Sequence, residues 1–141
     1  MFKSGIDVVG LAGASSVKLK KPALWHLMSE QSDWSGAVAH PAGRDSIHVT
    51  SFGAIPKRCL IMDGLFLAVK PSKLLSKKVT FDEQFKFHHY DIDFCLSCNK
   101  AGLKMSTCNI NVIHSSPGLT NYQSDMFQNS EQKFVDKYVK A

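Results

Sequence analysis

Two acids, Asp91 and Asp93, stand at the start of a segment with helical spacing, and a lone histidine, His114, follows further along the chain. An ionised carboxylate in such a place could take a proton from a hydroxyl group, which is general-base chemistry. The plainer interpretation is that Asp91 is a first-turn acid favoured by the helix dipole, and that His114 is a capped or surface histidine. Spacing alone favours the plainer interpretation of both residues.

The helix that would position these acids runs from Asp91 to Lys100 and is followed by Gly102, a natural helix stop. Asp91 shares a helix face with Phe94 and with two cysteines, so we expect Asp91 to point toward the body of the domain. At 100 degrees per residue, Asp93 lies about 200 degrees further around the helix. The two acids are therefore expected to have different roles.

The rest of the chain alternates short strands with short helices. We expect strands at Ile6–Gly13, Ala37–His40, Ser46–Phe52 and Lys104–Ile113. We expect helical segments within Leu24–Ser35, Pro71–Ser76 and Tyr122–Tyr138. Residues 15–24 form a lysine-rich loop, and Asp63-Gly64 divides an apolar stretch from Arg58 to Val69. A chain of 141 residues is enough for one core. The sequence thus predicts a single α/β domain spanning residues 1–141, with a mixed sheet and flanking helices.

The net charge of +5 comes mostly from lysine, and Arg44 and Arg58 are the only arginines. Nucleic-acid-binding proteins rely on arginine, and no aromatic residues are interleaved with the lysine clusters, so a solvated face is favoured over a nucleic-acid or membrane surface. A substrate that carries phosphate would also suit these lysines. The sequence has no run of about 18 apolar residues, so we expect no membrane span. It shows no signal peptide, and we expect a cytoplasmic protein.

The four cysteines are Cys59, Cys95, Cys98 and Cys108. Without a secretory context we expect them to be reduced. Cys95 and Cys98 form a CxxC pair, but the pair lies in a helical pattern and has no second CxxC. A zinc site would need Cys108 and one of the histidines at 88, 89 or 114 as further ligands. Core cysteines on a helix face are the favoured interpretation.

Four weak motifs in a fixed order carry a resemblance to a known family. They are the segment Val8–Gly13 with Trp25 and Gly36–His40, then Asp63-Gly64 before LFLAV, then FDEQF with HHYDIDFCLSCNKAGLK, and finally the strand that ends before His114. In this order they resemble the second half of a family 2-type glycosyltransferase with the GT-A fold, in the StrF-like branch of streptomycin biosynthesis. The resemblance spans most of the chain from Val8 to Tyr138.

The resemblance assigns roles to particular residues. Asp91 matches the catalytic base of inverting members, with Tyr90 in the position where many relatives have Glu. Five residues, namely Asp63, Gly64, Tyr90, Asp93 and Trp25, would shape the acceptor site or support it. His114 matches a histidine that joins the metal site in several members, so Mn²⁺ or Mg²⁺ is the implied cation. The implied reaction is inverting transfer from a sugar nucleotide to an acceptor hydroxyl.

The sequence departs from the family at the donor side. The Asp-x-Asp motif that holds metal and diphosphate at a strand end is missing, since Asp91-Ile-Asp93 begins a helix instead. We therefore expect a domain that lacks the donor-nucleotide half and is inactive alone. Two alternatives remain: a non-catalytic module that binds carbohydrate or protein, with Trp25 and Trp34 stacking on sugar rings, or an active site completed by a homodimer or a partner chain.

Overall fold

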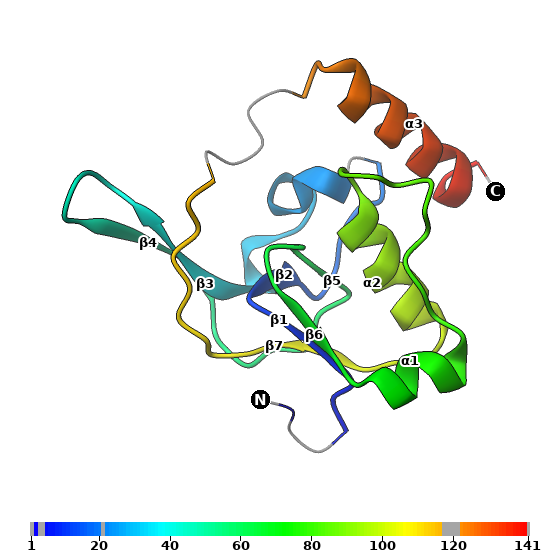
Figure 1. Cartoon of the computed structure of the whole chain (residues 1–141), viewed down its shortest axis with the longest axis horizontal. Helices are drawn as coiled ribbons and strands as arrows, with labels where there is room; N and C mark the ends of the chain where they lie inside the picture. Colours follow the sequence, from blue (N-terminus) through cyan, green and yellow to red (C-terminus); the bar gives the residue numbers. More distant parts are fainter. Residues whose placement is uncertain (1, 3–4, 21, 117–121, 141) are drawn as a thin grey trace.

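The structure of the protein, a computed structural model, describes residues 2, 5–20, 22–116 and 122–140. Over these residues it is a mixed α/β structure with two small sheets and three α-helices (Figure 1). The predicted α/β class is therefore confirmed, but the strands form two sheets where one mixed sheet was expected. No helix within the described ranges has the length and hydrophobicity needed to cross a membrane.

The smaller sheet has the order β6-β1-β7 and is mixed, since β1 pairs antiparallel with β6 and parallel with β7. The larger sheet has the order β4-β3-β2-β5 and is antiparallel throughout. The strands are β1 (Val8–Gly10), β2 (Ala12–Ala14), β3 (Trp34–Pro41), β4 (Ile47–Gly53), β5 (Ile61–Met62), β6 (Leu67–Val69) and β7 (Met105–Thr107). The β3–β4 hairpin projects from the body of the molecule (Figure 1).

The predicted strand Ile6–Gly13 is divided between the two sheets. Residues before Leu11 form β1 in one sheet, and residues after it form β2 in the other. The β2 backbone lies very close to Gly36 of β3, where a Cβ would come within 2.6 Å of the Cα of Ala12. Gly36 also has φ +120°, so both space and backbone conformation require glycine there. An apolar run cannot reveal such a division, because both halves are equally buried.

The three α-helices lie close to the predicted positions. They are α1 (Pro71–Lys77), α2 (Tyr90–Lys100) and α3 (Asp125–Tyr138). The Oγ of Ser124 accepts a hydrogen bond from Phe127 N (3.3 Å) and so caps α3. The helical segment expected within Leu24–Ser35 is found as two 3₁₀ helices, Pro22–Leu27, which begins before Leu24, and Gln31–Asp33.

The predicted strand Lys104–Ile113 is too long. Only Met105–Thr107 pairs with β1, and the chain then leaves that sheet. Further on, Ile113 forms an isolated parallel bridge with Ala39 of the larger sheet. The segment therefore passes from one sheet to the other, and it carries His114 toward the end of β3.

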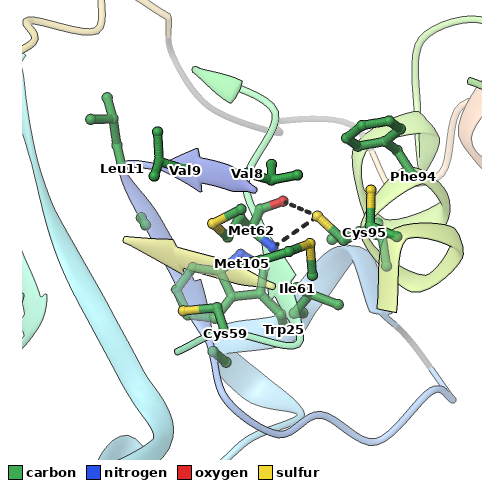
Figure 2. Close-up of a cluster of buried hydrophobic side chains, with 14 of the residues drawn as sticks. Val8, Val9, Leu11, Trp25, Cys59, Ile61, Met62, Phe94, Cys95 and Met105 are labelled. Atoms are coloured by element: carbon green, nitrogen blue, oxygen red, sulfur yellow. Dashed lines mark hydrogen bonds between the residues drawn. The ribbon is translucent and has the colours of Figure 1, made fainter. Parts of the chain in front are cut away.

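The core lies between α2 and the two sheets (Figure 2). All four cysteines are free and buried. The Sγ of Cys95 accepts a hydrogen bond from Met62 N (3.3 Å) and donates to Met62 O (3.7 Å), which ties α2 to β5. Burial raises the pKa of the Cys98 thiol to about 12, so it stays protonated. The favoured interpretation of the CxxC pair as core cysteines is confirmed.

Candidate functional site

The first turn of α2 is joined to the Asp63-Gly64 turn by two hydrogen bonds. The amide of Gly64 donates to Oδ2 of Asp91 (2.8 Å), and the hydroxyl of Tyr90 donates to the carbonyl of Gly64 (3.2 Å). A Cβ on Gly64 would lie 2.8 Å from the Cβ of Asp91 and closer still to the Tyr90 hydroxyl. Glycine is therefore needed here for close approach. Two motifs that are distant in the sequence form one structural unit.

Asp91 lies in the first helical turn, and its Oδ1 accepts a hydrogen bond from Ile92 N (2.9 Å). Burial raises its pKa to about 6, and the nearby carboxylate of Asp63 adds to the effect. The hydrogen bonds from Gly64 and Ile92 oppose the rise. Asp91 is thus both the predicted first-turn acid and a carboxylate that is ionised at neutral pH yet more basic than usual. A general base needs both properties.

Asp91 contributes to the wall of a cleft of about 240 Å³. The cleft brings together residues from five parts of the chain: Trp25, Asp63, Phe87, His88, His89, Asp91, Ile92, His114, Ser116 and Phe127. Four of the residues singled out in the sequence therefore meet in one place, namely Asp91, Asp63, His114 and Trp25. Gly64 and Tyr90 hold this wall in position through their bonds to each other and to Asp91.

Trp25 reaches the cleft but belongs mainly to the core, since it is only 5% exposed. It packs edge-to-face against Trp34, with ring centroids 6.2 Å apart. The indole N–H of Trp34 donates to Oγ of Ser29 (2.9 Å). Trp34 is partly exposed, but Trp25 is too buried to be the exposed stacking ring that was considered from the sequence. Its ring can offer a ligand little more than an edge.

Asp93 lies away from the cleft, in the contact between α2 and α3. It is fully buried, and its Oδ1 accepts hydrogen bonds from Lys137 Nζ (2.6 Å) and the Tyr138 hydroxyl (2.7 Å). Lys137 also pairs with Asp82 (2.7 Å), which lowers the pKa of that carboxyl to about 2. The structure thus gives Asp93 a bridging role between helices, separate from Asp91, as the helical angle predicted.

His88 and His89 were considered in the sequence only as zinc ligands, yet both line the cleft. His89 precedes α2 with φ 66°, a left-handed conformation that histidine adopts more often than most residues. Its ring is 2% exposed and packs against Phe127 and Phe134. Burial lowers its pKa to about 4, so it is neutral at pH 7. Two histidines directly before an acidic helix start were the signal that could have revealed them.

The Oγ of Ser130 fixes the tautomer of His89. Ser130 donates its hydrogen to the carbonyl of His88 (2.7 Å), so Nδ1 of His89 must donate to Ser130 Oγ (2.9 Å). The other ring nitrogen, Nε2, is then an acceptor. It is buried and has no hydrogen-bond partner among the described residues.

His114 is held by its backbone, whose N–H donates to the carbonyl of Ala39 (2.8 Å), and its ring lies 5.6 Å from that of His40. It shares the cleft with Asp91. Within the described part of the chain, no three His, Cys, Asp or Glu side chains are grouped closely enough to hold a metal ion. We assign no reaction step to a metal ion.

Comparison with known proteins gives no family for this chain, because no protein-family model and no curated protein matches it.

Proposed function

We propose that this chain is the acceptor-side part of a GT-A-like, inverting glycosyltransferase. Asp91 would be the general base that takes a proton from an acceptor hydroxyl as that oxygen attacks the anomeric carbon of a sugar nucleotide. The bond from that carbon to the nucleoside diphosphate breaks in the same step, and the nucleoside diphosphate leaves. The observation that carries the proposal is the bond between Gly64 and Asp91 at the cleft wall. It joins the two motifs that the family resemblance assigns to the acceptor site.

The charge of the cleft supports an acceptor role over a donor role. Asp63 and Asp91 are both acidic, and no lysine or arginine is among the described residues that line the cleft. A diphosphate needs cationic or amide donors, whereas a sugar hydroxyl needs acceptors. We therefore propose that the donor-binding part is supplied by another segment or a partner chain. A divalent cation would take His114 and further ligands from that part.

The experiment has two arms on the purified chain. Calorimetric titration with UDP, GDP and dTDP, with and without Mn²⁺, should give no binding. Nuclear magnetic resonance titration with a panel of neutral and amino monosaccharides should shift the signals of cleft residues, and Asp91→Asn should weaken that binding. Tight nucleotide binding would overturn the acceptor-side assignment, as would a panel in which no sugar perturbs the cleft.

A second candidate function is a non-catalytic, homodimeric binding module. The observation that favours it is the edge strand β4, where Ile47 and Val49 are each more than half exposed, as is Ile113 nearby. These residues line an apolar groove of about 380 Å³. An exposed edge can pair with the same edge of a second copy in a self-complementary way. Light scattering at high concentration tests this, and a monomer would contradict it.

A further inference from the structure

One end of the molecule gathers lysines from two separate segments. Helix α1, the loop that follows it and the C-terminal end of α2 lie on the same side of the structure (Figure 1). Neither segment contains an acid over a long stretch, since there is none from Gly64 to Phe81 and none from Phe94 to Ser124. We call this end the lysine face, and its four exposed lysines are Lys73, Lys77, Lys78 and Lys100.

The charge of the lysine face is not neutralised within the protein. None of its four lysines forms an ion pair with a carboxylate of the described residues. Lys137, which lies beside the face, differs from them because it pairs with both Asp82 and Asp93. Glu83 is the one further acid in the hollow that Lys77, Lys78 and Lys100 line, as far as the structure describes it. The face therefore keeps a net positive charge and attracts anions.

The fold places apolar groups beside these lysines. Phe81 lines the same hollow, whose volume is about 650 Å³. Its ring stacks on Phe94, with centroids 4.3 Å apart, and is still 50% exposed. Leu75, on α1, is 78% exposed, more than any other large hydrophobic side chain that the structure describes. The sequence shows no aromatic residue interleaved with the lysines, but the structure brings one to them.

This combination fits an extended anionic surface better than a single phosphate or carboxylate. Recognition of one such group relies on the paired N–H groups of arginine, whereas lysine is a flexible point charge. The two arginines, Arg44 and Arg58, lie outside both segments. An exposed leucine contributes nothing to binding a charged small molecule, but it is stabilised at the boundary between lipid headgroups and acyl chains. Neighbouring lysines attract anionic headgroups to the same place.

We propose that the lysine face docks on an anionic membrane surface. Leu75 and the exposed side of Phe81 enter the headgroup layer, and the four lysines contact the anionic headgroups. The inference is independent of the proposed function. Asp91 is in the first turn of α2 and Lys100 is its last residue, so about 14 Å of helix separates them. The Asp91 cleft is therefore not part of the docking face.

Sedimentation of the whole chain with lipid vesicles tests the proposal. One set of vesicles is phosphatidylcholine alone, and the other contains about 30% phosphatidylserine, which gives the surface a negative potential. At low salt we expect binding to the anionic vesicles to be about tenfold tighter or more. Most of this advantage should be lost at about 1 M salt, where the Debye length is only about 3 Å.

Variants separate the lysine face from the overall charge. Lys73→Gln combined with Lys77→Gln should weaken binding to the anionic vesicles about tenfold, because both side chains are exposed one turn apart on α1. Lys18→Gln combined with Lys20→Gln removes the same charge from exposed sites outside the face and is the matched control. Leu75→Asn should weaken binding about fivefold without changing its salt dependence, since it removes an apolar contact and not a charge.

The results divide clearly. Equal binding to the two kinds of vesicle, or binding to neither, would overturn the inference. Equal weakening in the two double variants would also overturn it, because the attraction would then belong to the whole charge of the chain. Polyglutamate is a further probe: if it binds through Lys73 and Lys77 while anionic vesicles do not, the face recognises an acidic protein and the membrane proposal fails. The sugar and nucleotide titrations decide the proposed function separately.

Discussion

The amide of Gly64 donates a 2.8 Å hydrogen bond to Oδ2 of Asp91, across 27 positions of sequence. Through this bond, the turn between β5 and β6 and the start of α2 form one wall of the cleft. The wall has no room for a side chain at residue 64. It also places Asp63 close enough to Asp91 to raise the pKa of the Asp91 carboxyl.

Asp63→Asn should lower the pKa of Asp91 from about 6 toward its ordinary value. Burial is the larger cause of the raised pKa, so the fall should be partial. The side-chain oxygen of the introduced asparagine can still accept from Leu65 N, as Asp63 Oδ1 does at 2.9 Å, so the turn should persist. Carboxyl carbon resonance titration measures the change. Asp45→Asn is the control, and an Asp91 pKa that does not move in Asp63→Asn would contradict the arrangement.

Gly64→Ala should lower the free energy of unfolding by about 1–3 kcal/mol, because the new Cβ meets Tyr90 and Asp91. Urea denaturation measures this loss. Tyr90→Phe removes the hydroxyl, which is among the closest atoms, and should recover part of the loss in the Gly64→Ala background. In the parent protein, Tyr90→Phe alone should destabilise, since it loses the bond to the Gly64 carbonyl. Strictly additive effects would show that residues 64 and 90 do not touch.

Lys137→Met should lower the free energy of unfolding by about 2–4 kcal/mol, because it leaves the fully buried Asp93 carboxylate with only the Tyr138 hydroxyl. Lys140→Met is the matched control. Lys140 pairs with the exposed Asp136 one turn away, and loss of that pair should change the free energy of unfolding much less, because solvent screens the two charges. Similar losses in the two variants, measured by urea denaturation, would mean that Asp93 is not a buried bridge.

His89 and Asp91 should give opposite pH dependence to stability. The pKa of His89 is lowered to about 4 in the folded state, so its contribution is present above about 6.5 and is lost as pH falls toward 4. The pKa of Asp91 is raised to about 6, so the folded state holds the extra proton, and stability is lost as pH rises from about 4 to 6. Each group changes the free energy of unfolding by about 3 kcal/mol over its pH range, and the two changes largely cancel because they have opposite signs.

A variant that removes one of the two groups should reveal how the other makes the free energy of unfolding depend on pH. His89→Asn should become more stable as pH falls from about 6.5 to 4.5, and Asp91→Asn should become less stable over the same range. Thermal or urea unfolding at several pH values measures the slope of stability against pH. A loss of stability that is the same at every pH does not change this slope. If the parent protein and both variants share one slope, neither group has a shifted pKa.

The sequence predicted best those elements whose signals are local. Helix α2, its end near Gly102 and the division of the apolar stretch at Asp63-Gly64 all follow from spacing and from glycine. The grouping of Asp91, Asp63 and His114 came from a family resemblance, and the structure places all three at one cleft.

What could not be predicted depends on partners far along the chain. The role of Asp93 requires Lys137 and Tyr138, which lie on α3. The tautomer of His89 requires Ser130, also on α3. The two-sheet architecture depends on a change of direction at Leu11 inside one apolar run, and hydrophobicity alone gives no sign of that change.

That change of direction bears on how the molecule unfolds. β1 and β2 are consecutive, yet each lies inside a different sheet, with Leu11 buried between them. Detaching either sheet would pull the strand that belongs to the other, so neither has an independent melting event. We expect one cooperative transition, with the amides from Val8 to Ala14 among the slowest in the chain to exchange with deuterium.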